Sequence, residues 1–221
     1  PSITKKLTVE MWCSIVEGGR ILRTINGSEA GINISYWMGV PQASINTVSG
    51  GRRISTAVYM PTGLHHYALI WETGSLTPLI WVVDGVVRSQ SSVPVSALSS
   101  YARTMIVGWG EGGPAETNYN VDELRIWDHA RSLDQIQDNM YKRLKGTEQG
   151  LALYYRFDEG EGADIYDASP SGLQGSMSGA TWIPGLVDLV GEDIIRGSIT
   201  FHGRASASFG TPIKKAVGSI T

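Results

Sequence analysis

Carboxylates that stand close together are the first residues in this chain that could do chemistry. Asp158, Glu159 and Glu161 lie in the segment FDEGEG, and two acids that flank a glycosidic bond are the machinery of glycoside hydrolysis. Neighbouring residues of an extended segment point in opposite directions, so Asp158 and Glu159 cannot easily converge on one bond. We therefore expect a solvated turn in which Asp158 caps backbone amides, and we assign no catalytic residue.

Two histidines and one cysteine are the next candidates. His65 and His66 are neighbours on an expected strand and face opposite sides, which makes a poor two-ligand metal site. Cys13 alternates with Met11 and Ile15. Because nothing nearby would activate its thiol, we expect a small buried side chain rather than a nucleophile.

Aromatic residues form the third class, with seven Trp and nine Tyr against three Phe. Trp and Tyr recur both in carbohydrate-stacking platforms and at protein interfaces. We expect most to be core residues, notably Trp12, Trp127, Tyr155 and Trp182. The sequence does not decide whether four others are buried in the core or available to a ligand: Trp37, Trp71, Trp81 and Trp109. Loops 26–31 and 110–118 are rich in Gly, Asn and Glu and could form a ligand-facing rim. The candidate ligand-binding residues are Trp71, Trp109, Glu111 and Asn118.

The elements that must position these residues are mostly strands. Alternating apolar residues, bounded by Gly, Pro, Ser and Asn, predict strands at 7–16, 32–38, 54–60, 66–72, 104–109, 119–127, 151–157, 199–201 and 205–209. Residues 79–87 predict a hairpin, because Asp84-Gly85 between apolar pairs is a strong turn signal. One helix among so many strands predicts an all-β sandwich of two packed antiparallel sheets.

The stretch YNVDELRIWDHARSLDQIQDNM, residues 119–140, joins a strand directly to that helix. Alternation places Leu124 and Ile126 on one face of the strand. The residues expected on the other face are Val121, Glu123, Arg125 and Trp127. Ser132 and Gln135 have the spacing of a capping box. An apolar stripe extends the expected helix toward Gly146, through Leu133, Ile136, Met140 and Leu144. Glu123 and Arg125, two apart on one strand face, are expected to form an ion pair.

Four blocks of the sequence, in order, resemble one family. They are LTVEMWCSI, LHHYALIWETGSLTPLIWVVDGVVRSQ, NVDELRIWDHARSLDQIQDNM and GLALYYRFDEGEGADIYDASPSGLQGSMSGATW. They are similar to blocks of laminin-G-like and pentraxin-like jelly rolls of the concanavalin A-like lectin/glucanase superfamily, and they cover roughly residues 7–182. The resemblance implies a jelly-roll sandwich in which the His65-His66 position orders the hairpin. The blocks specify the fold and no ligand.

The same resemblance raises the possibility of a metal. Many such domains bind calcium through acids in loops at one end of the sandwich, and calcium takes six to eight oxygen ligands. The candidates here are Asp122, Glu123 and Asp158. The family's first-strand aspartate is matched by His202 in FHG, which removes one oxygen ligand. A structural ion pair is therefore the preferred interpretation of Glu123, with Ca²⁺ as the alternative.

The order of the blocks departs from the family in one respect. Members usually begin with a strand ahead of the T-V-E-x-W strand, whereas here the similar segment, SITFHGRASASFGTPIKKAVGSIT, lies at the C-terminus. We expect one domain over residues 1–221, in which 197–221 supplies the missing first strand. Alternatively that segment opens a following repeat, because PIKKAVGSIT echoes PSITKKLTVEM.

Composition narrows the class of function. A length of 221 residues with 27 Gly suits one large all-β domain. A net charge of −3 without a Lys/Arg run makes nucleic acid an unexpected partner, and no apolar run approaches the ~20 residues of a membrane span. A single cysteine and an abrupt start at Pro1 indicate a fragment or processed product of a secreted or surface-exposed protein, bacterial or phage.

The sequence thus predicts a non-catalytic recognition module within a larger secreted, surface, phage or toxin protein. Its partner would be a glycan or a cell-surface protein. Two alternatives stay open, a structural domain of a large assembly without a ligand and a glycoside hydrolase, because the fold alone does not choose among functions.

Overall fold

The computed structural model describes residues 5–15, 19–26, 29–47, 50–55, 59–60, 62–96, 104–109, 118–187 and 197–209. At residues 25–26, 29–30, 47, 50–53, 55, 104, 108–109, 118 and 197–209 it describes the backbone alone.

The described part of the chain is mostly strand, with one helix between the tenth and eleventh strands. In chain order the elements are β1 Lys6–Ile15, β2 Gly19–Asn26, β3 Glu29–Trp37, β4 Val40–Thr47, β5 Gly50–Ser55, β6 Gly63–Glu72, β7 Leu79–Val83, β8 Val86–Ser91, β9 Thr104–Trp109, β10 Asn118–Trp127, α1 Leu133–Asn139, β11 Leu151–Tyr155, β12 Asp164–Ile165, β13 Gly175–Pro184 and β14 Gly197–Phe209.

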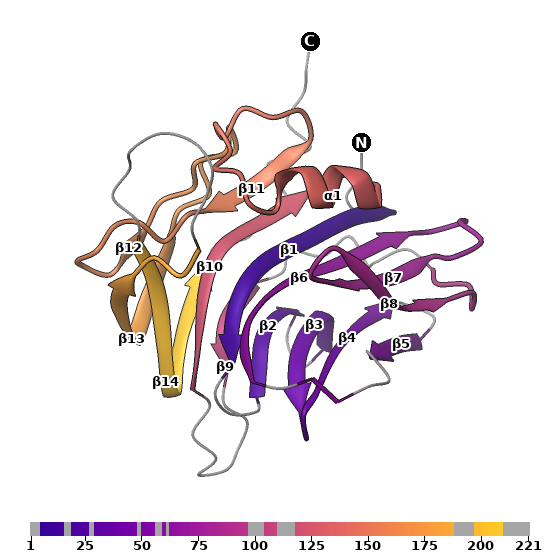
Figure 1. Cartoon of the computed structure of the whole chain (residues 1–221), viewed down its shortest axis with the longest axis horizontal. Helices are drawn as coiled ribbons and strands as arrows, with labels where there is room; N and C mark the ends of the chain where they lie inside the picture. Colours follow the sequence, from indigo (N-terminus) through magenta and orange to yellow (C-terminus); the bar gives the residue numbers. More distant parts are fainter. Residues whose placement is uncertain are drawn as a thin grey trace.

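The strands make two layers that face each other across the core (Figure 1). One layer contains β10, β1, β6, β7 and β8, with β11 beside β10, and the other contains β9, β2, β3, β4 and β5. Every pairing among these strands is antiparallel in the residues that the structure describes. This confirms the predicted jelly-roll sandwich. The layers are not separate sheets, however, because β14 pairs with both β9 and β10 and makes the hydrogen-bonded ladder continuous.

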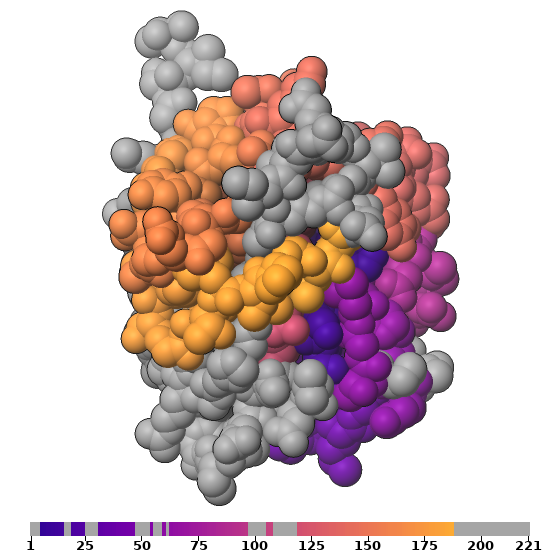
Figure 2. Space-filling model, turned by 60° about the vertical axis from the view of Figure 1, so that its left-hand side comes forward, coloured from indigo at the N-terminus to yellow at the C-terminus, as the bar shows by residue number. Residues whose placement is uncertain are grey.

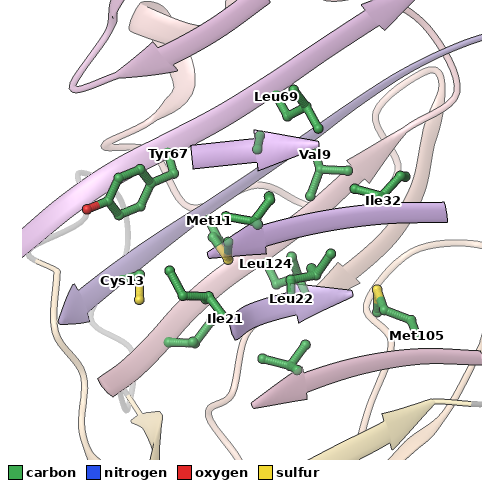
Figure 3. Packing of buried hydrophobic residues seen from close by; sticks show 14 of the residues in the cluster. Val9, Met11, Cys13, Ile21, Leu22, Ile32, Tyr67, Leu69, Met105 and Leu124 are labelled. Atoms are coloured by element: carbon green, nitrogen blue, oxygen red, sulfur yellow. The ribbon is translucent and has the colours of Figure 1, made fainter. Parts of the chain in front are cut away.

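The core lies between these layers and draws residues from both. Figure 3 shows Val9, Met11 and Cys13 of β1 close to Ile21 and Leu22 of β2. Cys13 is fully buried, and burial raises the pKa of its thiol. It is therefore a small core side chain, as the sequence predicts, and not a nucleophile.

The β7–β8 hairpin turns at Asp84 and Gly85, which both have positive φ, 52° and 70°. The Asp84 carboxylate accepts from the backbone N–H of His66 at 2.9 Å and lies 2.7 Å from Nδ1 of His65. The His66 ring lies on the opposite side of β6, where Nε2 is 3.5 Å from a carboxylate oxygen of Glu10. The two histidines thus face apart, and His65 orders the hairpin as expected.

Helix α1 begins with the predicted capping box. The Ser132 hydroxyl accepts from the N–H of Gln135, and the Gln135 side chain accepts from the N–H of Ser132. Ile136 is buried against β6 and β7, so the helix covers the outer face of this layer (Figure 1). In the described part of the chain no helix is long and apolar enough to cross a membrane.

The helix ends at Asn139, well before the expected end near Gly146. Arg125 of β10 donates to the carbonyl oxygens of Asn139 at 2.9 Å and Lys142 at 2.7 Å. These contacts bind the chain after Met140 to the sheet and prevent further turns. Leu144, predicted on the helical stripe, packs instead with Trp127, Leu151 and Tyr154.

Four of the described strands were not predicted from the sequence, namely β2, β4, β12 and β13, and β5 lies at Gly50–Ser55 rather than at 54–60. In β2, Ile21 and Leu22 are adjacent and both buried, because the ladder shifts register between Arg20 and Leu22. The bulge breaks the alternation on which strand prediction depends. In β13, four of the ten residues are Gly or Ser, which are weak strand formers, and the strand pairs with β14 along most of its length.

The C-terminal strand β14 lies within the ladder of this chain. It pairs with β10 (Tyr119 opposite Phe201), with β13 (Thr181 opposite Thr200) and with β9 (Val107 opposite Ala207). It is the element through which the two layers are joined.

Candidate functional site

The acidic pair Asp122-Glu123 lies at a β-bulge on β10. Glu123 has a φ of 53°, and between the pairs Trp12–Asp122 and Glu10–Arg125 two residues of β10 stand opposite one residue of β1. The bulge turns both Val121 and Leu124 into the core. The prediction that Val121 shares a face with Glu123 is therefore wrong, because the extra residue reverses the alternation.

The Glu123 side chain lies in a buried polar network on the side of the β10–β1–β6 layer that faces away from the core. It is 2% exposed. The Arg125 guanidinium lies 2.6 Å from its Oε2 atom, and the Tyr154 hydroxyl donates to the same oxygen. Arg143 lies 4.0 Å from the other oxygen. The predicted Glu123–Arg125 ion pair is confirmed.

Asp122 lies in the same region but has different partners. It is 4% exposed, and its Oδ2 atom accepts from the N–H of Leu186 at 3.1 Å. Val187 packs against Trp12, and in Figure 2 the segment that ends at residue 187 reaches the N-terminal strands. Burial, and then the neighbouring charge of Glu123, raise the pKa of Asp122 to about 7.

The three calcium candidates do not converge. Glu123 and Asp158 pair with arginines, Asp158 with Arg143, while Asp122 accepts from a backbone N–H. Within the described residues no group of three or more His, Cys, Asp or Glu side chains could hold a metal ion. Because calcium needs several oxygens directed at one point, these residues do not fit a calcium site.

The carboxylates of FDEGEG fix a turn. Glu159 accepts from the backbone N–H of Tyr166 at 2.7 Å, and Asp158 pairs with Arg143. Glu161 is exposed. The acid that demonstrably caps a backbone amide is thus Glu159, whereas the sequence favoured Asp158 for this role. The contacts of Asp158 and Glu159 serve the local fold.

Glu10 completes the polar network beneath α1. It is fully buried, with Arg131 and His66 as partners. Burial alone would raise the pKa of Glu10, but His66 and Arg131 bring it down to about 2. Arg131 also stacks over the Trp127 ring at 4.1 Å and donates to the Gln135 carbonyl. This network clamps the helix onto the sheet, and we assign it a structural role.

A different surface has the composition of a binding site: the outer face of β2–β4. On β3 and β4 the residues Ile32, Ile34, Tyr36, Ala43 and Ile45 point into the core. The intervening residues point away from the core, because side chains alternate along a strand. We define the outer face by Arg20, Arg23, Asn33, Ser35, Gln42 and Ser44, all of them half-buried.

Strand register arranges these residues in two rows across the sheet. One row runs Arg20, Ser35, Gln42 and the other Arg23, Asn33, Ser44. Arg20 and Arg23 are three apart and would normally lie on opposite faces. The bulge at Ile21-Leu22 brings both onto the same face, opposite residues that are two apart on β3.

An exposed aromatic residue lies next to the row that contains Ser35, further along β3. Trp37 follows Ser35 by two residues on β3 and is 64% exposed. The chain then turns through Met38 and Gly39, with φ of 49° and 81°. Tyr59, 68% exposed, packs against Gly39 so closely that a Cβ there would lie 1.9 Å from its ring. The Trp37 end of the outer face is therefore a fixed turn with apolar side chains available to a partner.

The structure does not bring the predicted ligand-binding residues together in one described site. Trp71 is fully buried in the core, because β6 is covered on both faces, so its indole is not accessible. Trp109 stands opposite Arg20 in the β9–β2 register, and Asn118 pairs with His202, but their side chains lie outside the described residues. Glu111 and most of loops 26–31 and 110–118 also lie outside them.

Sequence reasoning missed the outer face because it missed β2 and β4. A signal existed in the polar alternation of Asn33 with Ser35 in GINISYW and of Gln42 with Ser44 in PQASIN. No such signal places Arg20 and Arg23 on the same face. Their common orientation depends on a bulge, and a bulge is defined only by register with the partner strand.

Comparison with known proteins shows both a family and a set of similar folds. The family model described as concanavalin A-like lectin/glucanases superfamily matches residues 1–137. No curated protein matches the sequence significantly.

Among solved structures, a candidate carbohydrate-binding protein from Bacteroides ovatus is 20% identical with a TM-score of 0.58, over 75% of this chain and 50% of that one. The binding domain of botulinum neurotoxin DC in complex with SialylT is 9% identical with a TM-score of 0.51, over 80% and 50%. The binding domain of Paraclostridial Mosquitocidal Protein 1 is 12% identical with a TM-score of 0.51, over 80% and 50%. At these identities the likeness is one of fold. The chain spans about half the length of the structures that it matches.

Proposed function

This chain belongs to the concanavalin A-like lectin/glucanases superfamily, and we propose that it is a non-catalytic recognition module that binds a glycan through the outer face of β2–β4. One observation carries the proposal. Strand register aligns two polar rows, which begin at Arg20 and Arg23, and the exposed Trp37 lies next to the first row on the same face.

The chemistry of this face suits a sugar. Ser35, Gln42 and Ser44 supply hydroxyl and amide groups that can both donate and accept hydrogen bonds, as sugar hydroxyls require. Asn33 lies beside them, with Nδ2 3.5 Å from the Ser35 hydroxyl oxygen. Trp37 supplies an apolar ring face against which a sugar ring can stack. Paired strands hold the polar groups in fixed positions, so little conformational freedom is lost on binding.

The similar structures support the class of partner. One is a candidate carbohydrate-binding protein, and another is a toxin binding domain in complex with SialylT. By analogy we propose that this chain is part of a larger secreted or surface protein and presents the outer face to a glycan outside the cell. The acids that could have suggested hydrolysis are engaged in local contacts, Asp158 with Arg143 and Glu159 with a backbone amide.

A glycan array probed with the purified chain tests the proposal. We expect binding to a defined class of glycans, and at least tenfold weaker binding by the Trp37→Ala variant because the stacking surface is lost. Tyr166→Ala is the matched control, since Tyr166 is 58% exposed and lies beside β12, on another part of the chain.

Two outcomes would contradict the proposal. A folded chain that binds no glycan would favour the scaffolding alternative. Hydrolysis of any glycan on the array would show that the module is catalytic.

A further inference from the structure

We infer that the turn between β3 and β4 is a membrane contact, in which Trp37, Met38 and Tyr59, together the apolar tip, enter the headgroup region of a lipid bilayer. The inference goes beyond the proposed function and does not depend on it, because bilayers that carry no glycan suffice to test it. In Figure 1 this turn lies at the lower end of the molecule, where β3 and β4 meet.

The apolar tip exposes three large side chains that lie close together. Trp37 is 64% exposed, Met38 83% and Tyr59 68%. The Tyr59 ring packs against Gly39, where an added Cβ would lie 1.9 Å from it, so residues distant in the sequence form one cluster. Exposed apolar clusters of this kind mark surfaces that contact a partner or a membrane.

Hydrogen bonds hold the tip in one position. The Gly39 carbonyl accepts from the N–H of Met60 at 2.9 Å, and the Tyr36 hydroxyl donates to the Met60 carbonyl at 2.5 Å. These two bonds join the turn to the segment that carries Tyr59. Because Tyr36 already fills the core beneath the turn, the exposure of the tip is a fixed property of the fold.

The residue type at Met38 is unusual for its backbone. The turn between β3 and β4 has two residues, Met38 and Gly39, and both have positive φ, 49° and 81°. Asn, Asp and Gly are favoured at the first position of such a turn, because positive φ strains other side chains. The β7–β8 hairpin follows this preference with Asp84 and Gly85, at φ of 52° and 70°. Neither the backbone nor water favours a methionine at position 38, whereas an apolar environment outside the chain does.

The size of the tip favours a bilayer over a protein as its partner. A fully buried aromatic side chain covers ~150–250 Å², so the three partly exposed side chains present on the order of 400 Å² together. A stable protein interface takes about 800 Å² from each partner. A fluid bilayer needs no complementary surface, because lipids close around the side chains that enter it.

The composition of the tip suits the boundary between water and lipid. Trp and Tyr concentrate at this depth, because each combines an apolar ring with a polar atom. Met adds a flexible apolar side chain that adapts to its surroundings. The segments that form the tip, residues 30–51 and 54–71, contain no Lys, Arg, Asp or Glu, so their contact with lipid buries no charge. The contact is therefore expected not to require anionic lipids.

Flotation of the purified chain with lipid vesicles tests the inference. The probes are vesicles of phosphatidylcholine alone and vesicles of phosphatidylcholine with phosphatidylserine. We expect the chain to float with phosphatidylcholine vesicles, equally at about 50 and about 500 mM salt, because screening weakens only contacts between charges. Brominated phosphatidylcholine should quench tryptophan fluorescence, and Trp37→Phe should remove this quenching.

The variant Met38→Asn separates binding from folding. Asn suits the positive φ of residue 38, so the melting temperature should not fall, whereas the floated fraction should fall several-fold. Met38→Asn/Tyr59→Ser removes two of the three side chains and should lower flotation at least tenfold. Leu76→Asn is the matched control, because Leu76 is 92% exposed but lies between β6 and β7, at the opposite end of β6 from the segment that carries Tyr59. Its replacement should leave flotation unchanged.

Several results would overturn the inference. One is the absence of flotation with either kind of vesicle. Another is flotation with phosphatidylserine vesicles alone that high salt abolishes, which would assign the contact to charge. An equal loss for Leu76→Asn would show unspecific adhesion of apolar side chains. A dimer that Met38→Asn dissociates, detected by sedimentation without any flotation, would show that a second copy of the chain covers the tip. Each of these leaves the proposed function intact, because the glycan array tests that function without lipid.

Discussion

Two buried acids in one layer have opposite pKa shifts because their partners differ. Glu10 faces Arg131 and His66, which lower its pKa to about 2 against the effect of burial. Asp122 is buried, accepts from the backbone N–H of Leu186 and has the charge of Glu123 beside it, and its pKa rises to about 7. Buried carboxylates therefore contribute to stability with a sign that depends on their neighbours.

We expect Asp122→Asn to stabilise the protein above neutral pH. The folded-state pKa near 7 exceeds the ordinary value of 3.8, so the folded state holds a proton that the unfolded state releases. Wild-type stability should therefore fall as pH rises from about 4 to about 7, and the full penalty should persist above that. The amide keeps an oxygen acceptor for the Leu186 N–H and does not ionise. The stability gain should be roughly 2–4 kcal/mol at pH 8 and smaller at pH 5.

Urea unfolding at pH 5 and pH 8 measures this difference. Both pH values lie above the range in which Glu10 becomes protonated and loses its stabilising charge. Glu10 therefore contributes equally to stability at pH 5 and pH 8. Asp138→Asn, at an exposed position on α1, should change stability by less than about 0.5 kcal/mol at either pH. A gain for Asp122→Asn that is equal at the two pH values would argue against the raised pKa.

At the scale of elements, α1 shows how a short helix is fixed by its surroundings. Seven residues are too few for a stable helix in isolation. The capping box satisfies its first turn, Ile136 is buried against the sheet, and Gln137 donates to the Gly85 carbonyl at 2.7 Å. The helix in turn holds the β7–β8 hairpin against the same layer.

We expect Ser132→Ala to destabilise the protein by about 1 kcal/mol, because the variant leaves the N–H of Gln135 without its side-chain acceptor. Ser132→Thr keeps a hydroxyl acceptor and should restore most of the loss. Thermal and urea unfolding of the two variants, side by side, measure the contribution of the cap. Equal losses for both would assign the effect to packing around residue 132 instead.

Features encoded by neighbouring residues were predictable from the sequence. The capping box depends on Ser132 and Gln135, three residues apart, and the hairpin depends on Asp84-Gly85. Features that depend on a distant partner were not. Arg125 ends α1 through carbonyl oxygens 14 and 17 residues away, and the bulges at Glu123 and Ile21-Leu22 are defined only by register with another strand. The candidate site shares this property, because a bulge places Arg20 and Arg23 on one face.

At the scale of the whole molecule, β14 decides how the sandwich closes. It lies between β9 and β10 in the ladder and also pairs with β13. The alternatives from sequence were that the C-terminal segment completes the fold within the chain or that it opens a following repeat. We propose that the chain completes its own fold, because without β14 both β9 and β10 would present unpaired backbone groups at that edge.

Removal of residues 197–221 tests this proposal. We expect a melting temperature lower by about 10 °C or more, since a lost strand costs several kcal/mol and each kcal/mol shifts the midpoint by roughly 2–4 °C in a chain of this size. The truncated chain should also associate through its open edge, which sedimentation detects. Removal of residues 210–221 alone is the control, because it retains all of β14.

A synthetic peptide of residues 197–209 separates loss of the strand from general damage. If β14 fills a position that the sheet requires, the peptide should bind the shortened chain, raise its melting temperature and suppress its association. An unchanged melting temperature after removal of residues 197–221 would contradict completion within the chain. It would mean that the remaining strands form a stable sandwich and that β14 is available to pair with a neighbouring repeat.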